Sequence, residues 1–159
     1  MPGVTCDPCA GDTDFDATSD GGRTYRPLTY NLPADGLPVS ITLDPKYENI
    51  VYVTLGGYGM PHVWRLDTLK PEPRTWENIG NGLPDVWASS LLVDPKDSKS
   101  LYVATDEGVF HSANSGATWT KWSEGLYPGV MSVELLLFER DRLLRLVTHG
   151  NGVWQRKLP

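Results

Sequence analysis

The sequence predicts an all-β fold, and three observations lead to that prediction. The 159-residue chain contains 16 Gly and 13 Pro, which suit short strands and tight turns better than helices. Apolar residues nowhere keep the i, i+3, i+4 spacing of an amphipathic helix over a sustained stretch. Instead, a unit of four expected strands returns every 43 to 51 residues, measured between Thr24, Thr75 and Thr118. Four strands at this period are typical of one blade of a β-propeller.

Composition limits the classes of partner. Hydrophobic residues make up 40% of the chain, with six Trp and seven Tyr, so a packed core is expected. The net charge is −6 and no Lys/Arg cluster offsets it, which argues against nucleic acid as a partner. No apolar run approaches the roughly 18 residues of a membrane span, so no membrane partner is expected, and no signal peptide is visible.

The first two strands of each unit form a hairpin that repeats three times. Two of the hairpins turn at Asp-Pro, fifty residues apart at Asp44 and Asp94, and the third turns at Glu139-Arg140-Asp141. The matching segments are "VSITLDPKYENIVYVTLGG" (Val39–Gly57), "ASSLLVDPKDSKSLYVATDEG" (Ala88–Gly108) and "MSVELLLFERDRLLRLVTHGNG" (Met131–Gly152).

A third and a fourth strand complete each unit. The expected third strands are His62–Leu66, Gly108–Ser112 and Gly152–Arg156. The expected fourth strands each begin with a Thr-aromatic pair and are Thr24–Leu28, Thr75–Ile79 and Thr118–Trp122.

A short polar motif joins strands three and four. Ser112-x-Asn114-x-Gly116-x-Thr118-Trp119 aligns with Thr18-x-Asp20-x-Gly22-x-Thr24-Tyr25. The Asp or Asn side chain accepts backbone N–H bonds within its own turn, and Gly supplies a positive φ. Thr restarts the strand, and the aromatic ring is expected to be buried beside the neighbouring sheet. We therefore expect structural roles for Asp20, Gly22, Thr24, Tyr25, Asn114, Gly116, Thr118 and Trp119.

This motif resembles the Asp-box, or BNR repeat, of sialidases, xyloglucan-hydrolysing glycosidases, sortilin and photosystem II assembly factors. The resemblance covers residues 14–156, and the middle copy, Arg65–Trp76, keeps only Thr75-Trp76 of the pattern. It implies a β-propeller in which the box lies away from the ligand-binding face. It also points to a secreted or periplasmic protein, although the sequence itself leaves the compartment open.

Counting the units gives about three and a half four-stranded antiparallel blades. After a flexible segment at 1–13, the Asp-box propeller spans 14–159 as a half blade (14–28), two blades (39–79 and 88–122) and a three-stranded blade (131–156). Because an open arc leaves unpaired strand edges, the chain is expected either to be a fragment of a larger propeller or to close as a homo-oligomer. We favour a dimer in which Thr24–Leu28 completes the partner's last blade.

A propeller's ligand face is usually built from the turns between strands two and three and between successive blades. Aromatic rings stack on sugars and carboxylates bind hydroxyl groups, so a glycan or a protein is the expected ligand. For Trp87 the main alternative to ligand binding is a packing role, and for Asp106 and Glu107 it is a place in a solvated turn. For His62 a binding role and a structural role are both open. The candidate residues are Tyr58, His62, Asp85, Trp87, Asp106, Glu107, Tyr127, His149 and Asn151.

No catalytic residue, metal or cofactor is assigned from the sequence. Asp85 with Asp106 or Glu107 is a possible glycosidase pair, but their spacing does not single them out. Cys6 and Cys9 lack further zinc ligands and are read as a local disulfide or part of a tail. The acidic run from Asp12 to Asp20 lacks the glycine and the bidentate glutamate of a calcium loop.

The function expected from the sequence is a non-enzymatic interaction module that binds protein or glycan through its turn-rich face. The alternative is a fragment of a glycoside-hydrolase-like protein or of a purely structural repeat protein. Whether the chain is an enzyme stays open at this point, with binding favoured.

Overall fold

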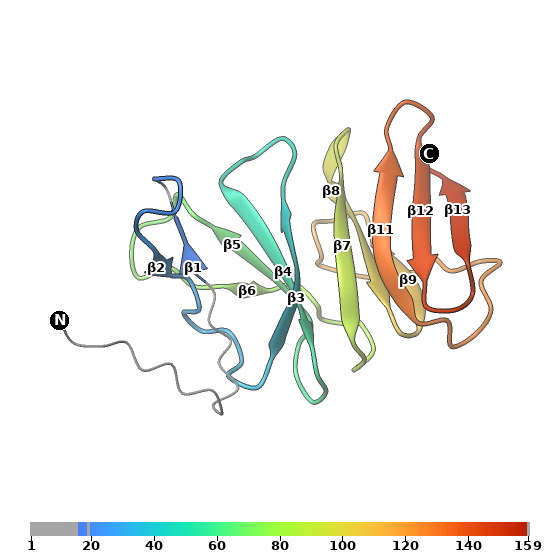
Figure 1. Cartoon of the computed structure of the whole chain (residues 1–159), viewed down its shortest axis with the longest axis horizontal. Helices are drawn as coiled ribbons and strands as arrows, with labels where there is room; N and C mark the ends of the chain where they lie inside the picture. The colour runs from blue at the N-terminus through green and yellow to red at the C-terminus, as the bar shows by residue number, and fades with distance from the viewer. Residues whose placement is uncertain (1–15, 19, 159) are drawn as a thin grey trace.

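The computed structural model describes residues 16–18 and 20–158. The predictions for 1–13, Cys6, Cys9 and the start of the acidic run therefore lie outside the described residues. Four antiparallel sheets stand side by side (Figure 1), and the described residues contain strands and turns but no helix. The prediction of an all-β chain with antiparallel blades is confirmed. No helix of the described chain is long and apolar enough to cross a membrane.

The first blade is a four-stranded meander in the order β3-β4-β5-β6. Its inner strand β4 is buried along its whole length, because neighbouring sheets cover both of its faces. The fourth strand, β6, is only two residues long, shorter than the expected Thr75–Ile79. The bounds are β3 (Leu37–Leu43), β4 (Ile50–Gly56), β5 (Val63–Asp67) and β6 (Glu77–Asn78).

The second blade repeats this meander, and the third has no fourth strand among the described residues. The second blade comprises β7 (Ala88–Asp94), β8 (Asp97–Thr105), β9 (Gly108–Ser112) and β10 (Thr120–Lys121). The third blade comprises β11 (Ser132–Phe138), β12 (Leu143–Thr148) and β13 (Val153–Lys157). The edge of β13 that faces away from β12 is therefore unpaired in the described chain.

The N-terminal half blade is a two-stranded ribbon of β1 (Asp16–Ala17) and β2 (Arg26–Pro27). It packs against the first blade through Ala17 and Leu28. On β3, the alternating residues Leu37, Ile41 and Leu43 are between 52% and 61% exposed. The two-stranded half blade contributes no strand beside β3, so this apolar stripe stays uncovered.

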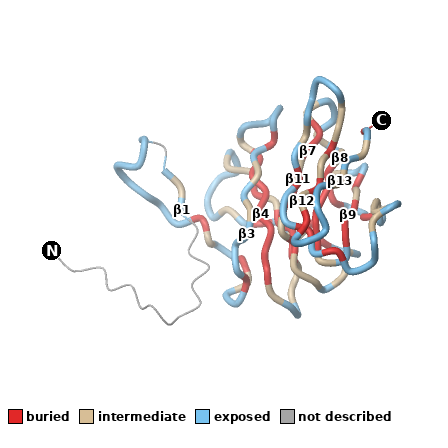
Figure 2. The backbone as a smooth tube through the Cα atoms, turned by 45° about the vertical axis from the view of Figure 1, so that its right-hand side comes forward, coloured by how far each residue is buried: buried red, intermediate tan, exposed pale blue. Residues whose placement is uncertain are grey.

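The core lies between the blades rather than inside any one of them. Three apolar clusters fill the three interfaces: half blade with first blade, first with second, and second with third. Figure 2 shows the buried segments concentrated where the sheets face one another. Each blade is thus stabilised mainly by its neighbours, as in other repeat proteins.

Polar contacts in the turns between strands one and two connect the same neighbours. Asp44 accepts a hydrogen bond from Ser98 of the second blade at 2.9 Å. Asp94 of the second blade forms a bidentate pair with Arg142 of the third, at 2.7 and 2.6 Å, and both side chains are largely buried. The side chain of Arg142 holds the pKa of Asp94 below its usual value. The Asp of each Asp-Pro turn therefore bridges to the following blade.

Candidate functional site

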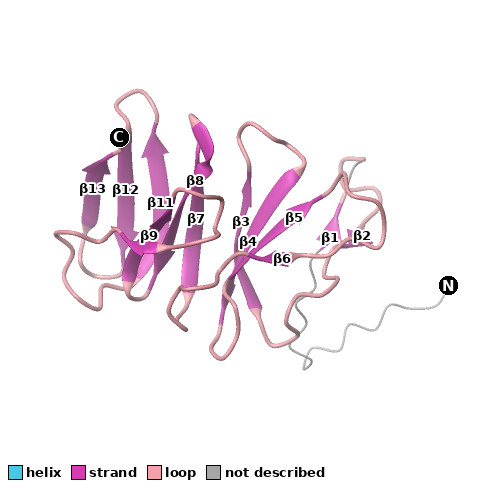
Figure 3. Cartoon of the chain, turned by 180° about the vertical axis from the view of Figure 1, so that it is seen from behind, coloured by secondary structure: helices cyan, strands magenta, loops and turns pink. Residues whose placement is uncertain are grey.

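The turns that follow the second and fourth strands lie along one edge of the arc. In a meander, the turns after strands two and four point the same way, opposite to the turns after strands one and three. Figure 1 and Figure 3 show the β4–β5 and β12–β13 turns at the lower edge of the arc. We call this edge the turn rim, formed by residues 57–62, 79–87, 106–107, 122–131 and 149–152.

At the centre of the turn rim, Asp85 ties the β4–β5 turn to the β6–β7 turn. Its carboxylate accepts the Gly59 amide at 2.8 and 2.9 Å and contacts His62 Nε2 at 3.0 Å. The other ring nitrogen of His62 contacts the Leu55 carbonyl oxygen at 3.2 Å. Both partners of the ring are hydrogen-bond acceptors, so a ring N–H can donate to either of them.

The two members of this pair differ in access. His62 is 3% exposed, whereas the side chain of Asp85 is 57% exposed. The hydrogen bond from His62, together with that from the Gly59 amide, lowers the pKa of Asp85. Asp85 therefore faces solvent as a carboxylate, and His62 supports it from below. Of the two roles that the sequence left open for His62, the structure favours the supporting one.

An open groove with a volume of about 370 Å³ runs beside Asp85. Its walls are the two turns that Asp85 connects, residues 59–62 and 80–85. Tyr58, which precedes this wall, is 68% exposed. An exposed ring in the turn that forms one wall of the groove, with the Asp85 carboxylate on the other wall, suits a flat, hydroxyl-rich ligand.

Trp87 and Asp106 continue the turn rim into the second blade. Trp87 is half-buried and lies against Gly56, where an added β-carbon would come within 2.6 Å of the indole. The Trp87 carbonyl accepts the Asp106 amide at 3.2 Å. Burial raises the pKa of the half-buried Asp106 carboxyl. Trp87 thus has the packing role weighed as its alternative, and the half-buried Asp106 is bonded to it through its backbone amide.

Within the described part of the chain, the remaining sequence candidates make no hydrogen bond to this group. Glu107 is exposed in the β8–β9 turn, and Tyr127 is 69% exposed with its ring 5.8 Å from that of Trp154. His149 and Asn151 are both exposed in the β12–β13 turn. The structure therefore joins His62 to Asp85 and Trp87 to Asp106, and it places Tyr58 in the β4–β5 turn next to Gly59. Glu107 stays in the β8–β9 turn of the second blade, Tyr127 lies between the second and third blades, and His149 and Asn151 lie in the third blade.

Sequence reasoning missed the backbone groups that build the site. The Gly59 amide and the Leu55 carbonyl hold Asp85 and His62, yet neither depends on a recognisable side chain. The run Gly56-Gly57-Tyr58-Gly59 was the available signal, since a glycine-rich turn brings amides close to a partner. Within the described residues, no group of three or more His, Cys, Asp or Glu is placed to hold a metal ion.

The Asp20 and Asn114 hairpins lie at the opposite edge from the turn rim. Asp20 accepts the Arg23 and Thr24 amides at 2.9 and 3.0 Å and the Thr24 hydroxyl at 2.7 Å. These bonds lower the pKa of Asp20 to about 2. Asn114 accepts the Thr118 amide at 2.9 Å and also donates to the Thr118 hydroxyl. Asn therefore replaces Asp without loss of the turn.

The aromatic residues of these hairpins differ from the expectation in one respect. Trp119 is 9% exposed in the interface between the first and second blades, but Tyr25 is 65% exposed. The reason is positional: Trp119 packs against the blade before it, whereas no described blade precedes the N-terminal half blade.

Side-by-side meanders that share inter-blade cores define a partial β-propeller, and its turn rim presents one groove beside an aromatic ring and a carboxylate. No family model matches the chain. The chain is 27% identical to Xyloglucanase Xgh74A of Acetivibrio thermocellus over 154 residues, an alignment that covers 81% of this chain. The same alignment covers 18% of the xyloglucanase, so the chain spans less than a fifth of that relative's length.

Solved structures of GH74 enzymes share the fold. The Niastella koreensis GH74 enzyme superposes with a TM-score of 0.69 at 17% identity, covering 91% of this chain and 24% of that enzyme. The GH74 xyloglucanase of Xanthomonas campestris gives 0.57 at 13% identity, covering 83% and 23%. Together these matches support homology to GH74 xyloglucanases over one segment of their β-propeller structure.

Proposed function

We propose that this chain is a propeller segment of a glycoside-hydrolase-related protein and that its turn rim binds a xyloglucan-type glycan. The similarity to a xyloglucanase along 81% of the chain carries this proposal. It favours the hydrolase-related alternative over the purely non-enzymatic binding module expected from sequence. The hairpins at 18–25 and 112–119 are proposed as Asp-box repeats, on the strength of their side-chain-to-amide hydrogen bonds.

The groove beside Asp85 supplies the chemistry for a sugar. The exposed Tyr58 ring offers a flat apolar face on which a pyranose stacks. The Asp85 carboxylate keeps unoccupied acceptor capacity toward solvent, because carboxylate oxygens accept about four hydrogen bonds in total. Sugar hydroxyl groups are donors that match it.

A second candidate function, hydrolysis within this segment, rests on the opposite pKa shifts of two rim carboxyls. Burial raises the pKa of Asp106, while His62 lowers that of Asp85. Glycoside hydrolysis uses one carboxyl that holds a proton and one that stays ionised. In this scheme Asp106 donates its proton to the leaving-group oxygen, and Asp85 takes a proton from the water that forms the new bond to the anomeric carbon.

Calorimetric titration with a xyloglucan oligosaccharide tests the binding proposal. We expect a dissociation constant below about 1 mM, or about −4 kcal/mol. Tyr58→Ala is expected to weaken binding at least tenfold. Tyr47→Ala is the matched control, because Tyr47 is 49% exposed in the β3–β4 turn at the opposite edge. No heat of binding at 1 mM, or equal losses in both variants, would contradict the proposal.

A reducing-sugar assay on the same oligosaccharide separates binding from hydrolysis. The hydrolytic scheme predicts that the wild-type chain releases reducing sugar and that Asp106→Asn abolishes this turnover while binding remains. Binding without turnover in the wild-type chain would leave the rim as a glycan-binding segment and reject the Asp106 scheme for this chain.

Self-association stays a separate proposal. The described chain has an incomplete blade at each end, which favours closure by a second copy or by further blades. Closure by a second copy predicts twice the chain mass in sedimentation, and a monomer would contradict it.

A further inference from the structure

Two tryptophans occupy the same position in successive blades. Trp76 follows the third strand of the first blade, and Trp119 follows that of the second. The indole N–H of Trp76 donates to the Leu28 carbonyl, and that of Trp119 donates to the Ile79 carbonyl, both at 2.7 Å. Each carbonyl belongs to the residue directly after the fourth strand of the preceding blade. Trp76 is 2% and Trp119 is 9% exposed.

Each indole fills a socket made by equivalent residues. Around Trp119, the preceding blade contributes Val63, Ile79 and Leu83, and its own blade contributes Leu101, Val103 and Phe110. Around Trp76, the corresponding residues are Ala17, Leu28, Leu32, Val51, Val53 and Trp64.

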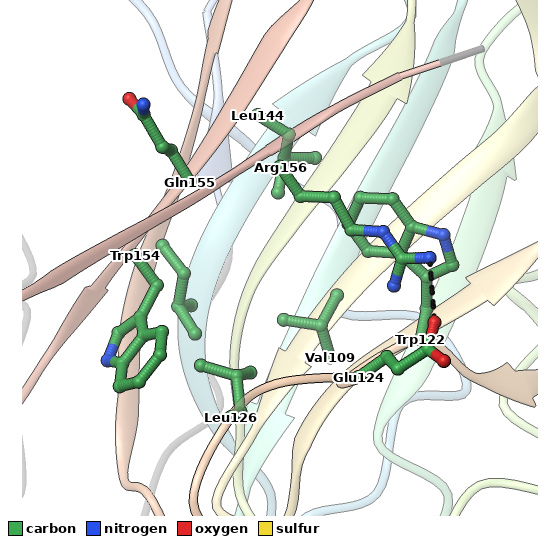
Figure 4. Close-up of a pocket in the computed structure, with 9 residues that line it drawn as sticks. Val109, Trp122, Glu124, Leu126, Leu144, Trp154, Gln155 and Arg156 are labelled. Carbon is green, nitrogen blue, oxygen red and sulfur yellow. Dashed lines mark hydrogen bonds and ion pairs between the residues drawn. The ribbon is translucent and has the colours of Figure 1, made fainter.

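The repeats place a third set of equivalent residues between the second and third blades. Aligning Thr148 with Thr105 gives Leu144 and Leu146 as the equivalents of Leu101 and Val103. Trp154 pairs with Leu146 as Phe110 pairs with Val103. The second blade supplies Val109, Trp122 and Leu126 in the places of Val63, Ile79 and Leu83. All six equivalents line one open pocket of about 50 Å³. Figure 4 shows their side chains around this space, with the ion pair of Arg156 and Glu124 at one end.

The hydrogen-bond acceptor of the third socket is also in place. The Trp122 amide donates to Val109 at 2.8 Å, as the Ile79 amide donates to Val63 at 3.0 Å. The Ile79 carbonyl then accepts an indole, but no described residue donates a hydrogen bond to the Trp122 carbonyl. Among residues 16–18 and 20–158, the buried Trp154 indole nitrogen has no hydrogen-bond partner, whereas that of its counterpart Trp64 donates to Pro61.

We infer that this pocket is a third tryptophan socket and that its occupant is a Thr-Trp strand of the same repeat type. That strand pairs with the free edge of β13, and its indole donates to the Trp122 carbonyl. The inference rests on the fold alone and does not depend on glycan binding. It is a case of strand addition to an exposed sheet edge, in which backbone bonds supply affinity and a side-chain pocket supplies specificity.

The occupant is a tryptophan rather than the Tyr25 of a second copy. Both filled sockets hold an indole whose donor nitrogen lies on the side of the ring system, 2.7 Å from the carbonyl. A phenol carries its donor at the far end of the ring instead. Moving β2 to a partner would also remove Leu28 and Leu32 from the core cluster that contains Trp76.

A synthetic peptide of residues 112–122, SANSGATWTKW, is a direct probe. Titrated into the ¹⁵N-labelled chain, it is expected to bind below about 1 mM and to shift the Trp154 indole resonance and the Leu126 and Leu146 amides. The matched peptide, in which Ala replaces the residue corresponding to Trp119, is expected to bind at least tenfold more weakly, because buried tryptophans dominate such interfaces. Equal binding of the two peptides, or no shift at 1 mM, would overturn the inference.

A protein variant checks the location of binding. Leu126→Trp places an indole in the pocket from its own wall and is expected to abolish peptide binding while the amide spectrum stays dispersed. If that variant does not fold, Gln155→Trp at the exposed rim of the pocket replaces it, with the same expectation. Unchanged binding in a folded variant would contradict the assignment. A dimer of the chain without peptide, dissociated by Tyr25→Ala, would assign the socket to a second copy and would also overturn the inference.

Discussion

Truncation of Trp119 to alanine probes the packing between the first and second blades. An aromatic side chain of this kind buries about 150–250 Å², which at about 25 cal/mol per Å² corresponds to roughly 4–6 kcal/mol as an upper bound. Measured large-to-small changes at buried tryptophans cost about 3–5 kcal/mol. With Trp119 9% exposed and its indole bonded to the Ile79 carbonyl, we expect a loss of about 4 kcal/mol.

Urea unfolding followed by tryptophan fluorescence and circular dichroism measures this loss. A domain of this size should also show a fall in melting temperature of about 8–16 °C. Trp119→Phe separates the ring from its N–H and is expected to cost about 1–2 kcal/mol. Tyr25→Ala is the matched control, since the equivalent ring in the half blade is 65% exposed, and it should change stability by less than about 0.5 kcal/mol. Similar losses for Trp119→Ala and Tyr25→Ala would refute the reasoning.

Three further predictions address other contacts. Arg142→Ala should cost about 3–5 kcal/mol in urea unfolding, because it leaves Asp94 buried without its cation. Because Arg142 holds the pKa of Asp94 below 3.8, this pair stabilises the fold above about pH 4, and its contribution is lost as the pH falls. The free energy of unfolding of Arg142→Ala should therefore decrease less steeply below about pH 4 than that of the wild-type chain. Gly116→Ala should cost about 2 kcal/mol or more of unfolding free energy, because φ is 87° and the added carbon would lie 2.7 Å from Ile79 of the preceding blade. Gly82→Ala, where φ is 92° and the space is open, should cost about 1–2 kcal/mol. Equal losses in the two variants would contradict this reasoning. Asp85→Ala should speed amide exchange in residues 57–62 without affecting the strands, and unchanged exchange there would show that the carboxylate does not hold that turn.

The repeated strands were predictable because their signal is local. Alternating Val, Leu and Tyr residues around the Asp44 and Asp94 turns, and the two polar hairpins, recur in phase. The shortness of the fourth strands was not predictable, since β6 and β10 each pair over only two residues before the chain bends toward the next blade. Strand length there depends on where the next blade begins, which a local pattern does not record.

The site was less predictable because its parts come from backbone and from distant turns. Asp85 and Tyr58 were identified as candidates by residue type and turn position. The burial of His62 beneath Asp85, and the contact of Trp87 with Gly56, follow from how two blades approach each other. The pairing of Arg142 with Asp94 spans 48 residues. The equivalent Asp44 of the first blade bonds the Ser98 hydroxyl instead of an arginine.

A map of amide shifts during titration with a xyloglucan oligosaccharide tests the central claim most directly. The account predicts saturable shifts in residues 57–62 and 80–87 along the turn rim. It also predicts none in the β3–β4 turn or in the hairpin around Asn114, which lie at the other edge. Shifts confined to that other edge, or no shifts at any concentration up to about 1 mM, would contradict it.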